Sequence, residues 1–255
     1  MGYRGSDVRC GNIVGSDGRC FIVALDHGLT MPMAFADVDK TFELVLSGRP
    51  DAVVVQKGLL GRIEPLRRRG VALIAQITGS PGGIGKRLLG GVQEVLACGA
   101  DAVSIQVDLY GQQADAEALE LLASAVGSAG SFGVPVLAMM YPREADHAVT
   151  RDVQRIKAAA RYAAEVGASL VKLPAPASPE EWSDVVRYCP IPVLLAGGAK
   201  MPLPQLGDAL AAALACGVRG AVVGRSVFSS SNPTSAVTEL MQRVQRGDLS
   251  VKFRA

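Results

Sequence analysis

The amino-acid sequence predicts an α/β fold in which strand–helix units close into a (β/α)8 barrel. Short apolar runs recur eight times, helix-compatible stretches alternate with them, and glycine ends several of these stretches just before the next run. The chain has 255 residues, which suits one such barrel of about 250 residues. We therefore expect a single TIM-barrel domain over residues 1–255, in which residues 1–20 form a short N-terminal extension.

The eight apolar runs are rich in Val, Ile, Leu and Ala, and each is short enough to be a fully buried strand. They occupy residues 21–25, 52–56, 72–77, 102–107, 135–140, 169–173, 191–196 and 220–223. The helix-compatible stretches occupy residues 37–47, 59–69, 88–98, 113–129, 150–166, 179–188, 204–216 and 233–246. Asp37, Ser178 and Asn232 stand where three of these helices should begin.

Glycines mark where the predicted units end. Gly48, Gly99, Gly167 and Gly217 each stand at the expected end of a helix. Because glycine tolerates the left-handed backbone conformation, they predict a repeated helix-to-strand turn. Residues 15–18, Gly-Ser-Asp-Gly, predict a hairpin in the extension, which would plug the bottom of the barrel. A doubly wound open sheet is the alternative fold, but no Gly-x-Gly-x-x-Gly follows the first run.

Composition argues against several classes of function. Apolar residues make up 49% of the chain and aromatic residues 5%, so the core is expected to be aliphatic. A formal net charge of +2 argues against binding to nucleic acid or to a membrane surface through bulk charge. The five cysteines lack metal-ligand spacing, and no basic-then-apolar leader or apolar run of about 18 residues is present. We expect a cytoplasmic protein with reduced cysteines.

Lys172 is the one charged residue inside the apolar run at residues 169–173. An unpaired ammonium is very costly to bury against packing helices, whereas the interior of a barrel near its open end can hold it. Removal from water there would favour the neutral amine, which is the nucleophile that a Schiff base requires. The alternative is a lysine that extends from a strand end to water.

Further candidates follow the C-terminal ends of the runs, where barrel active sites lie. Tyr141 is a candidate for moving protons, and Asp26 is a candidate for orienting the amine and balancing its charge. The alternatives are a tyrosine that packs on a loop and an aspartate that caps a helix. Lys57 is a rival nucleophile, for which we expect a binding role or a salt bridge to Asp26. His27 and His147 cannot hold a metal alone, so we expect neither a metal nor another cofactor.

The loops after the last two runs predict a phosphate site. Gly197 and Gly198 follow the seventh run, and Gly224 and Arg225 follow the eighth. Glycine lets backbone N–H groups approach an anion, and the guanidinium of Arg225 suits a phosphate. A phosphate site beside an interior lysine indicates a phosphorylated carbonyl substrate that is held for imine formation.

These motifs resemble the archaeal-type class I aldolase family, which includes fructose-bisphosphate aldolases and 2-amino-3,7-dideoxy-D-threo-hept-6-ulosonate synthases. The matching stretches are Ala-Leu-Asp-His-Gly at 24–28, Asp-Ala-Val-Val-Val-Gln-Lys-Gly at 51–58, Leu-Ala-Met-Met-Tyr-Pro-Arg at 137–143, Val-Lys at 171–172, Ala-Gly-Gly-Ala-Lys at 196–200 and Val-Gly-Arg-Ser-Val-Phe at 223–228. They span nearly the whole chain, and the version at 138–143 is closer to the synthases. Glu144, Gln106 and Asp108 depart from the family pattern, which puts the acceptor aldehyde in question.

The resemblance implies a metal-independent class I aldolase or transaldolase. It implies that Lys172 forms the Schiff base, that Tyr141 and Asp26 move protons, and that the glycine loops with Arg225 and His27 bind substrate. The donor would be a phosphorylated ketose or a dihydroxyacetone phosphate-like ketone, and the acceptor an aldehyde such as aspartate semialdehyde. It also implies a homo-oligomer, a large ring such as a decamer.

Three alternatives to this function remain open. A class I fructose-bisphosphate aldolase would use the same lysine chemistry. A thiolase-type acyltransferase on a related scaffold would depend on coenzyme A. A regulatory or structural barrel would bind sugar phosphates without forming an imine, and it would not need Asp26, Tyr141 and Lys172.

Overall fold

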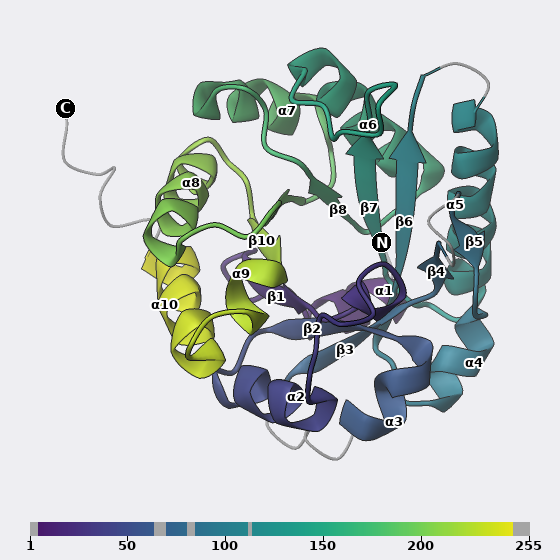
Figure 1. Cartoon of the computed structure of the whole chain (residues 1–255). Helices are drawn as coiled ribbons and strands as arrows, with labels where there is room; N and C mark the ends of the chain where they lie inside the picture. The colour runs from purple at the N-terminus through teal and green to yellow at the C-terminus, as the bar shows by residue number, and fades with distance from the viewer. Residues whose placement is uncertain (1–4, 64–69, 81–84, 112–113, 247–255) are drawn as a thin grey trace.

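The structure is a computed structural model that describes residues 5–63, 70–80, 85–111 and 114–246 (Figure 1). In this part of the chain, eight parallel strands close into a barrel in the order β1–β10–β9–β8–β7–β6–β3–β2. Their bounds are β1 Cys20–Ala24, β2 Ala52–Gln56, β3 Ala72–Gln76, β6 Ala102–Leu109, β7 Val136–Pro142, β8 Leu170–Leu173, β9 Val193–Ala196 and β10 Gly220–Val223. Each predicted run overlaps one of these strands, so the predicted (β/α)8 TIM barrel is confirmed.

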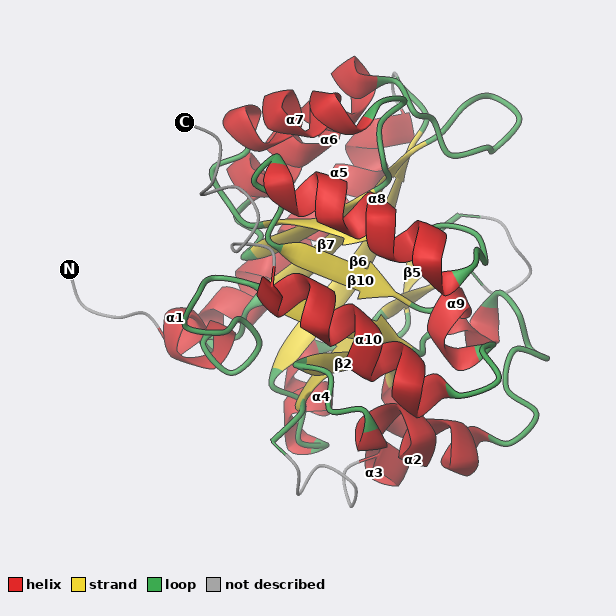
Figure 2. Cartoon of the chain, turned by 90° about the vertical axis from the view of Figure 1, so that its left-hand side faces the viewer, coloured by secondary structure: helices red, strands yellow, loops and turns green. Residues whose placement is uncertain are grey.

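Helices surround the strands on all sides (Figure 2). The covering helices are α2 Val38–Ser47, α3 Leu60–Ile63, α4 Val92–Ala97, α5 Ala114–Ser131, α6 Val153–Val166, α7 Trp182–Tyr188, α8 Leu203–Ala215 and α10 Pro233–Arg246. Residues 64–69 of the predicted third helix lie outside the described residues. None of the helices in the described residues is both long and apolar enough to span a membrane.

Shorter elements occupy several loops. They are α1 Gly5–Cys10, α9 Arg225–Phe228, the 3-10 helices η1 His27–Leu29, η2 Lys57–Leu59 and η5 Pro179–Glu181, and the antiparallel pair β4 Thr78–Gly79 with β5 Arg87–Leu88. Most of them follow the C-terminal end of a strand, so they surround the end of the barrel where active sites lie.

The apolar core has an inner and an outer layer. Residues that alternate along each strand point into the barrel or out toward the helices. On β8, Leu170 belongs to the inner cluster, whereas Val171 and Leu173 belong to the outer one. This alternation directs Lys172 into the barrel, where Leu170 also points.

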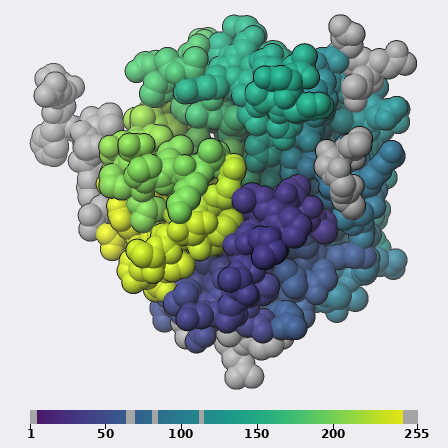
Figure 3. Space-filling model, viewed as in Figure 1, coloured from purple at the N-terminus to yellow at the C-terminus, as the bar shows by residue number. Residues whose placement is uncertain are grey.

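Figure 3 shows the end of the barrel at which α9 lies, and the N-terminal residues cover the other end. Ile13 is buried within the inner cluster, and α1 lies at the opposite end of the molecule from α9 (Figure 2). The turn at residues 15–18 is present, since the N–H of Gly18 donates to the carbonyl of Gly15 at 2.9 Å. The predicted hairpin is wrong, however, because the residues before that turn form helix α1 instead of a strand.

The predicted helix starts are confirmed by capping hydrogen bonds. Asp37 accepts from the backbone N–H of Lys40 at 2.9 Å, and Asn232 accepts from that of Ser235 at 3.0 Å. At the third start, the N–H of Ser178 donates to the Glu181 carboxylate at 2.9 Å. Each bond satisfies a backbone donor that the helix itself or its flank would leave unpaired.

Three of the four predicted glycine turns are left-handed. Gly99, Gly167 and Gly217 have φ angles of +87°, +100° and +96°. The prediction is wrong at Gly48, whose φ is −74°, because Arg49 takes the left-handed conformation there. Gly48 has a packing role instead, since a Cβ atom at this position would lie 2.5 Å from the Cβ of Val237 on α10.

Candidate functional site

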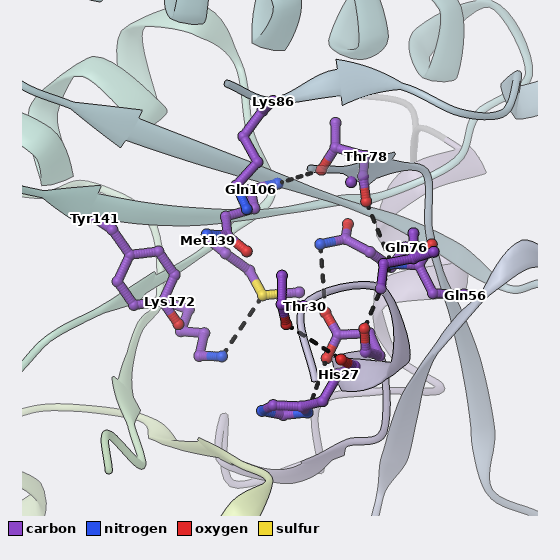
Figure 4. A pocket seen from close by; sticks show the side chains of 13 residues that line it. His27, Thr30, Gln56, Gln76, Thr78, Lys86, Gln106, Met139, Tyr141 and Lys172 are labelled. Carbon is purple, nitrogen blue, oxygen red and sulfur yellow. Dashed lines mark hydrogen bonds and ion pairs between the residues drawn. The ribbon is translucent and has the colours of Figure 1, made fainter. Parts of the chain in front are cut away.

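Asp26, His27, Tyr141 and Lys172 lie together at the C-terminal ends of their strands. They line one narrow cavity of about 60 Å³, shown in Figure 4. His27, Tyr141 and Lys172 also line a larger cavity of about 380 Å³, which extends toward the loops after β9 and β10. The predicted residues around the lysine are therefore brought together, and the lysine stands where the two cavities meet.

The amine of Lys172 is buried beside Met139 and Tyr141. The residue is 7% exposed. Its Nζ donates to the sulfur of Met139 at 3.6 Å and lies 5.6 Å from the centre of the Tyr141 ring. A thioether is a weak acceptor, so this hydrogen bond leaves the amine available for another partner. The register of β7 and β8 aligns Met139 with Lys172, which places Tyr141 one pleat further along the same face.

A chain of buried polar side chains orients Asp26. The Ser104 hydroxyl donates to the Gln76 amide oxygen at 3.0 Å, and the Gln76 amide nitrogen donates to Asp26 Oδ2 at 3.3 Å. Ser104 and Gln76 are buried. Such a chain fixes the Asp26 carboxylate through side chains whose own rotamers are held by packing.

His27 is held against the glycine loop in an environment that disfavours its charged form. Burial lowers its pKa, the nearby charges of Lys172 and Arg225 lower it further, and Asp26 opposes them. Its ring packs edge-on against Phe228 at 5.1 Å between centroids. A Cβ atom at Gly224 would lie 2.4 Å from His27 Cε1, so the glycine is needed for this close approach.

The four residues predicted to bind phosphate all line the 380 Å³ cavity: Gly197, Gly198, Gly224 and Arg225. Their contributions differ. Gly198 is left-handed, with a φ of +64°, whereas the N–H of Gly197 is engaged by the Val222 carbonyl at 3.1 Å and is not available to a ligand.

Arg225 is partly available to an anion. Its Nη2 donates to the Gly198 carbonyl at 2.6 Å, which ties the two loops together. Its Nε is buried and has no hydrogen-bond partner among the described residues. A buried donor without a partner is costly, so an anion in this cavity would satisfy it.

Lys57 lies elsewhere. Its Nζ pairs with Glu94 Oε1 at 2.6 Å, and this hydrogen bond lowers the pKa of Glu94. The predicted salt bridge to Asp26 is wrong, because Lys57 begins η2 and its side chain crosses Gly90 toward α4. Lys57 is not among the residues that line the cavities described here.

Sequence reasoning missed Lys86, Gln76 and Ser104. Gln76 and Ser104 carried a usable signal, since each is a polar residue within an apolar run, as Lys172 is. Lys86 carried little signal, because it follows a glycine-rich stretch and no pattern near it in the sequence predicts that it lines the cavity. It enters the cavity from the side opposite His27 in Figure 4.

Lys86 belongs to a cluster of charges beyond the narrow cavity. Asp108 Oδ1 accepts from Arg143 Nε at 2.7 Å and from Gln106 Nε2 at 3.3 Å. Lys86 Nζ lies 3.8 Å from Asp108 Oδ2. Glu144, the other departure from the family pattern, points away and pairs with Arg155 at 3.0 Å.

The described residues hold no group of three or more His, Cys, Asp or Glu side chains that could bind a metal ion. The five cysteines are free thiols, and burial raises the pKa of Cys20 and of Cys189. Burial therefore holds these two thiols in the protonated form, in which they are poor nucleophiles.

Two curated relatives resemble the chain over most of its length. It is 35% identical to the 2-amino-3,7-dideoxy-D-threo-hept-6-ulosonate synthase 1 of Archaeoglobus fulgidus, covering 92% of this chain and 89% of the relative. It is 31% identical to the 2-amino-4,5-dihydroxy-6-oxo-7-(phosphonooxy)heptanoate synthase of Streptomyces griseus, covering 93% of this chain and 89% of the relative.

The solved structure of a Schiff-base-forming fructose-1,6-bisphosphate aldolase has the same fold. It superposes with a TM-score of 0.82 at 24% identity, covering 93% of this chain and 98% of that one. The sequence profile of the DeoC/LacD family aldolases matches residues 20–230. The chain belongs to the DeoC/LacD aldolase family.

Proposed function

We propose that the protein is a class I aldolase in which Lys172 forms a Schiff base with a phosphorylated three-carbon ketone and joins it to an aldehyde such as aspartate semialdehyde. The observation that carries this proposal is the position of the Lys172 amine. It lies inside the barrel, beside the Tyr141 ring, where the narrow cavity meets the 380 Å³ cavity.

The chemistry needs no group beyond the side chains of the chain and water. The Lys172 amine adds to the ketone carbon, and the resulting carbinolamine loses water to give a protonated imine. Loss of a proton from the adjacent carbon gives an enamine, whose carbon attacks the aldehyde and forms the new carbon–carbon bond. Water then hydrolyses the imine, which releases the product and the free amine.

Tyr141 and Asp26 are assigned to assist the Lys172 amine. Tyr141, whose ring centre lies 5.6 Å from the amine, moves protons at the carbinolamine and at the adjacent carbon. Asp26, oriented by Gln76, faces the same cavity and balances the positive charge of the imine. His27, whose charged form is disfavoured by burial, forms part of the wall of the same cavity.

The name of the Streptomyces griseus product suggests the two substrates. A heptanoate with a 6-oxo group, a 7-phosphonooxy group and 4,5-hydroxyls divides by retro-aldol logic between carbons 4 and 5. The ketone fragment is dihydroxyacetone phosphate, and the aldehyde fragment is aspartate semialdehyde. The 380 Å³ cavity, with Arg225 Nε free for an anion, supports a phosphorylated donor.

Aldol transfer is the reaction that these observations support over acyl transfer, because the family is one of aldolases. A homo-oligomer, such as a decamer, and a cytoplasmic location remain predictions of the sequence resemblance. Light scattering would test the first and cell fractionation the second.

Product formation tests the proposed function. Purified enzyme is incubated with dihydroxyacetone phosphate and L-aspartate semialdehyde, and the product is identified by mass spectrometry and NMR. We expect a seven-carbon 2-amino-6-oxo acid that carries the phosphate. Consumption of fructose 1,6-bisphosphate without any such product would favour the fructose-bisphosphate aldolase alternative.

A further inference from the structure

The narrow cavity borders a third cavity on its far side. Lys86 and Gln106 line both of them, so these two side chains stand at the boundary between the two spaces, here called the passage. The third cavity has a volume of about 590 Å³, and Asp108, Tyr110 and Glu117 also line it. If the donor phosphate binds in the cavity next to Arg225, this third cavity is the space left on the opposite side for an acceptor.

The charges at the passage are not balanced. Asp108 lies between two cations, with Arg143 Nε at 2.7 Å from one oxygen and Lys86 Nζ at 3.8 Å from the other. The side chains of Lys86 and Asp108 are only 11% and 14% exposed. Arg143 and Lys86 thus share one carboxylate, and the long Lys86 contact leaves room for a second anion at the amine.

Asp108 is the better-positioned partner for a cation. Its Oδ1 already accepts from Arg143 and from Gln106, which fixes the plane of the carboxylate. Its Oδ2 has only the long Lys86 contact among the described residues. A carboxylate oxygen has two lone pairs and favours a charged donor, so this oxygen suits a substrate ammonium.

We propose that Lys86 and Asp108 form the acceptor subsite, in which Lys86 binds a carboxylate and Asp108 binds the neighbouring ammonium of an α-amino acid semialdehyde. This inference rests on the proposed function and names the residues that give that function its selectivity. Arg143 is a positioning residue, which holds Asp108 in place.

This arrangement distinguishes between two kinds of acceptor. An α-amino carboxylate presents one charge of each sign on two groups of the same carbon, which matches Lys86 and Asp108. The phosphate of glyceraldehyde 3-phosphate could pair with Lys86 but offers no cation to Asp108, whose carboxylate it would meet inside a narrow passage. The subsite therefore favours the zwitterionic aldehyde and disfavours the phosphorylated one.

The test uses acceptors that each lack one charged group. Succinic semialdehyde is aspartate semialdehyde without the amino group, and 3-aminopropanal is the same molecule without the carboxylate. The value of kcat/KM is measured for all three aldehydes and for glyceraldehyde 3-phosphate, with dihydroxyacetone phosphate as donor. The enzymes compared are the wild type, Asp108→Asn and Lys86→Gln.

We expect a crossed pattern. In the wild type, loss of either group lowers kcat/KM by about 10- to 100-fold, the effect of one charge-assisted hydrogen bond. In Asp108→Asn the amino group no longer matters, while the carboxylate still does. In Lys86→Gln the carboxylate no longer matters, while the amino group still does. A merely structural role for either residue would lower all four values together.

Lys57→Gln and Glu144→Gln are the matched controls. Each removes a charge at the same rim, from a residue that pairs with another side chain and does not line the three cavities. Both should keep the wild-type order of acceptors. Variants of Lys86 and Asp108 that also keep that order, or a wild type that prefers glyceraldehyde 3-phosphate, would overturn the subsite.

Failure of the subsite and failure of the proposed function give different results. Borohydride reduction of the wild type with dihydroxyacetone phosphate alone requires no acceptor. An adduct together with an unchanged order of acceptors in the variants contradicts only the subsite. Absence of both the adduct and the aldol product contradicts the proposed function, and with it the subsite.

Discussion

The two sides of the Lys172 cavity are lined by different kinds of chemical group. The side toward β9 and β10 consists of glycine backbone, apolar wall and one guanidinium, whose loops are joined by hydrogen bonds from Arg225 to Gly198 and from Met201 to Ser226. The side toward β3 and β6 carries charged side chains from several elements, among them Lys86, just before β5, and Asp108 on β6. The side built from backbone suits a phosphate group that many substrates share. The side built from side chains suits the part of the substrate that differs from one enzyme to another.

Substitution of Lys172 should abolish the reaction, whichever side of the cavity binds the donor or the acceptor. Lys172→Met keeps a long unbranched side chain in an apolar position, so the barrel should remain folded. Turnover should fall by about 10⁴-fold or more, because no other side chain replaces the nucleophile. The measurement is single-turnover product formation, with circular dichroism as the folding control. A variant that retains substantial turnover would place the nucleophile elsewhere.

Substitution of Tyr141 should separate binding from proton transfer. Tyr141→Phe removes the hydroxyl and leaves the ring that packs beside the lysine. We expect kcat to fall by about 10²- to 10³-fold, while dihydroxyacetone phosphate still binds with nearly the wild-type Kd. Stopped-flow kinetics and calorimetry measure the two quantities. Equal losses in kcat and in affinity would mean that Tyr141 mainly binds the donor.

Substitution of Arg225 tests only the side toward β9 and β10, which we call the donor side because the donor phosphate is proposed to bind there. Arg225→Gln should raise the KM for dihydroxyacetone phosphate by about 10- to 100-fold, since a charged donor to the phosphate is lost. The unphosphorylated analogue dihydroxyacetone should be affected less than about threefold, and the order of acceptors should not change. If the order of acceptors changes as well, the two sides are not independent.

Substitution of Gly224 tests the close approach that the donor side requires. In Gly224→Ala the new Cβ atom would lie 2.4 Å from His27 Cε1 and 2.7 Å from the Ala24 carbonyl oxygen. Both neighbours must move, so the free energy of unfolding should fall by about 1 to 3 kcal/mol. Urea denaturation measures the change. Gly28→Ala is the control, because its Cβ would have no atom within 4 Å.

The pH dependence of stability gives the smallest effect. Burial lowers the pKa of His27 below its ordinary value of 6.5. Between these two values the unfolded chain binds a proton that the folded chain does not, so stability falls as pH falls below 6.5. The slope contributed by His27 is at most about 1.4 kcal/mol per pH unit, and His27→Asn should remove it. An unchanged slope in that variant would mean that folding does not shift the pKa of His27.

The contrast between the two sides of the cavity also explains which parts of the site could be predicted from the sequence. The strands, Lys172 and the glycine loops were predictable because each depends on residues close together in the chain: an apolar run, a lysine within it, or two glycines after it. Gly48 shows where local reasoning failed, because its role depends on Val237, far away in the sequence.

The acceptor side could not be assembled in this way. Lys86 and Asp108 meet only because β3 and β6 are neighbours in the barrel and β5, which follows Lys86, pairs with β4 after β3. Asp108 stands just after a predicted run, but Lys86 carries no local pattern that distinguishes it from an ordinary surface charge. The hydrogen-bonded chain likewise joins Ser104 on β6, Gln76 on β3 and Asp26 after β1, so the sequence showed only its individual polar residues.

Borohydride trapping with dihydroxyacetone phosphate, followed by peptide mapping, tests the central claim most directly. Reduction converts a Schiff base into a stable secondary amine, so mass spectrometry identifies the lysine that formed it. The account predicts one adduct, on Lys172, that is absent in Lys172→Met. An adduct on Lys86 or Lys57 would contradict it, as would the absence of an adduct when calorimetry shows that the donor is bound.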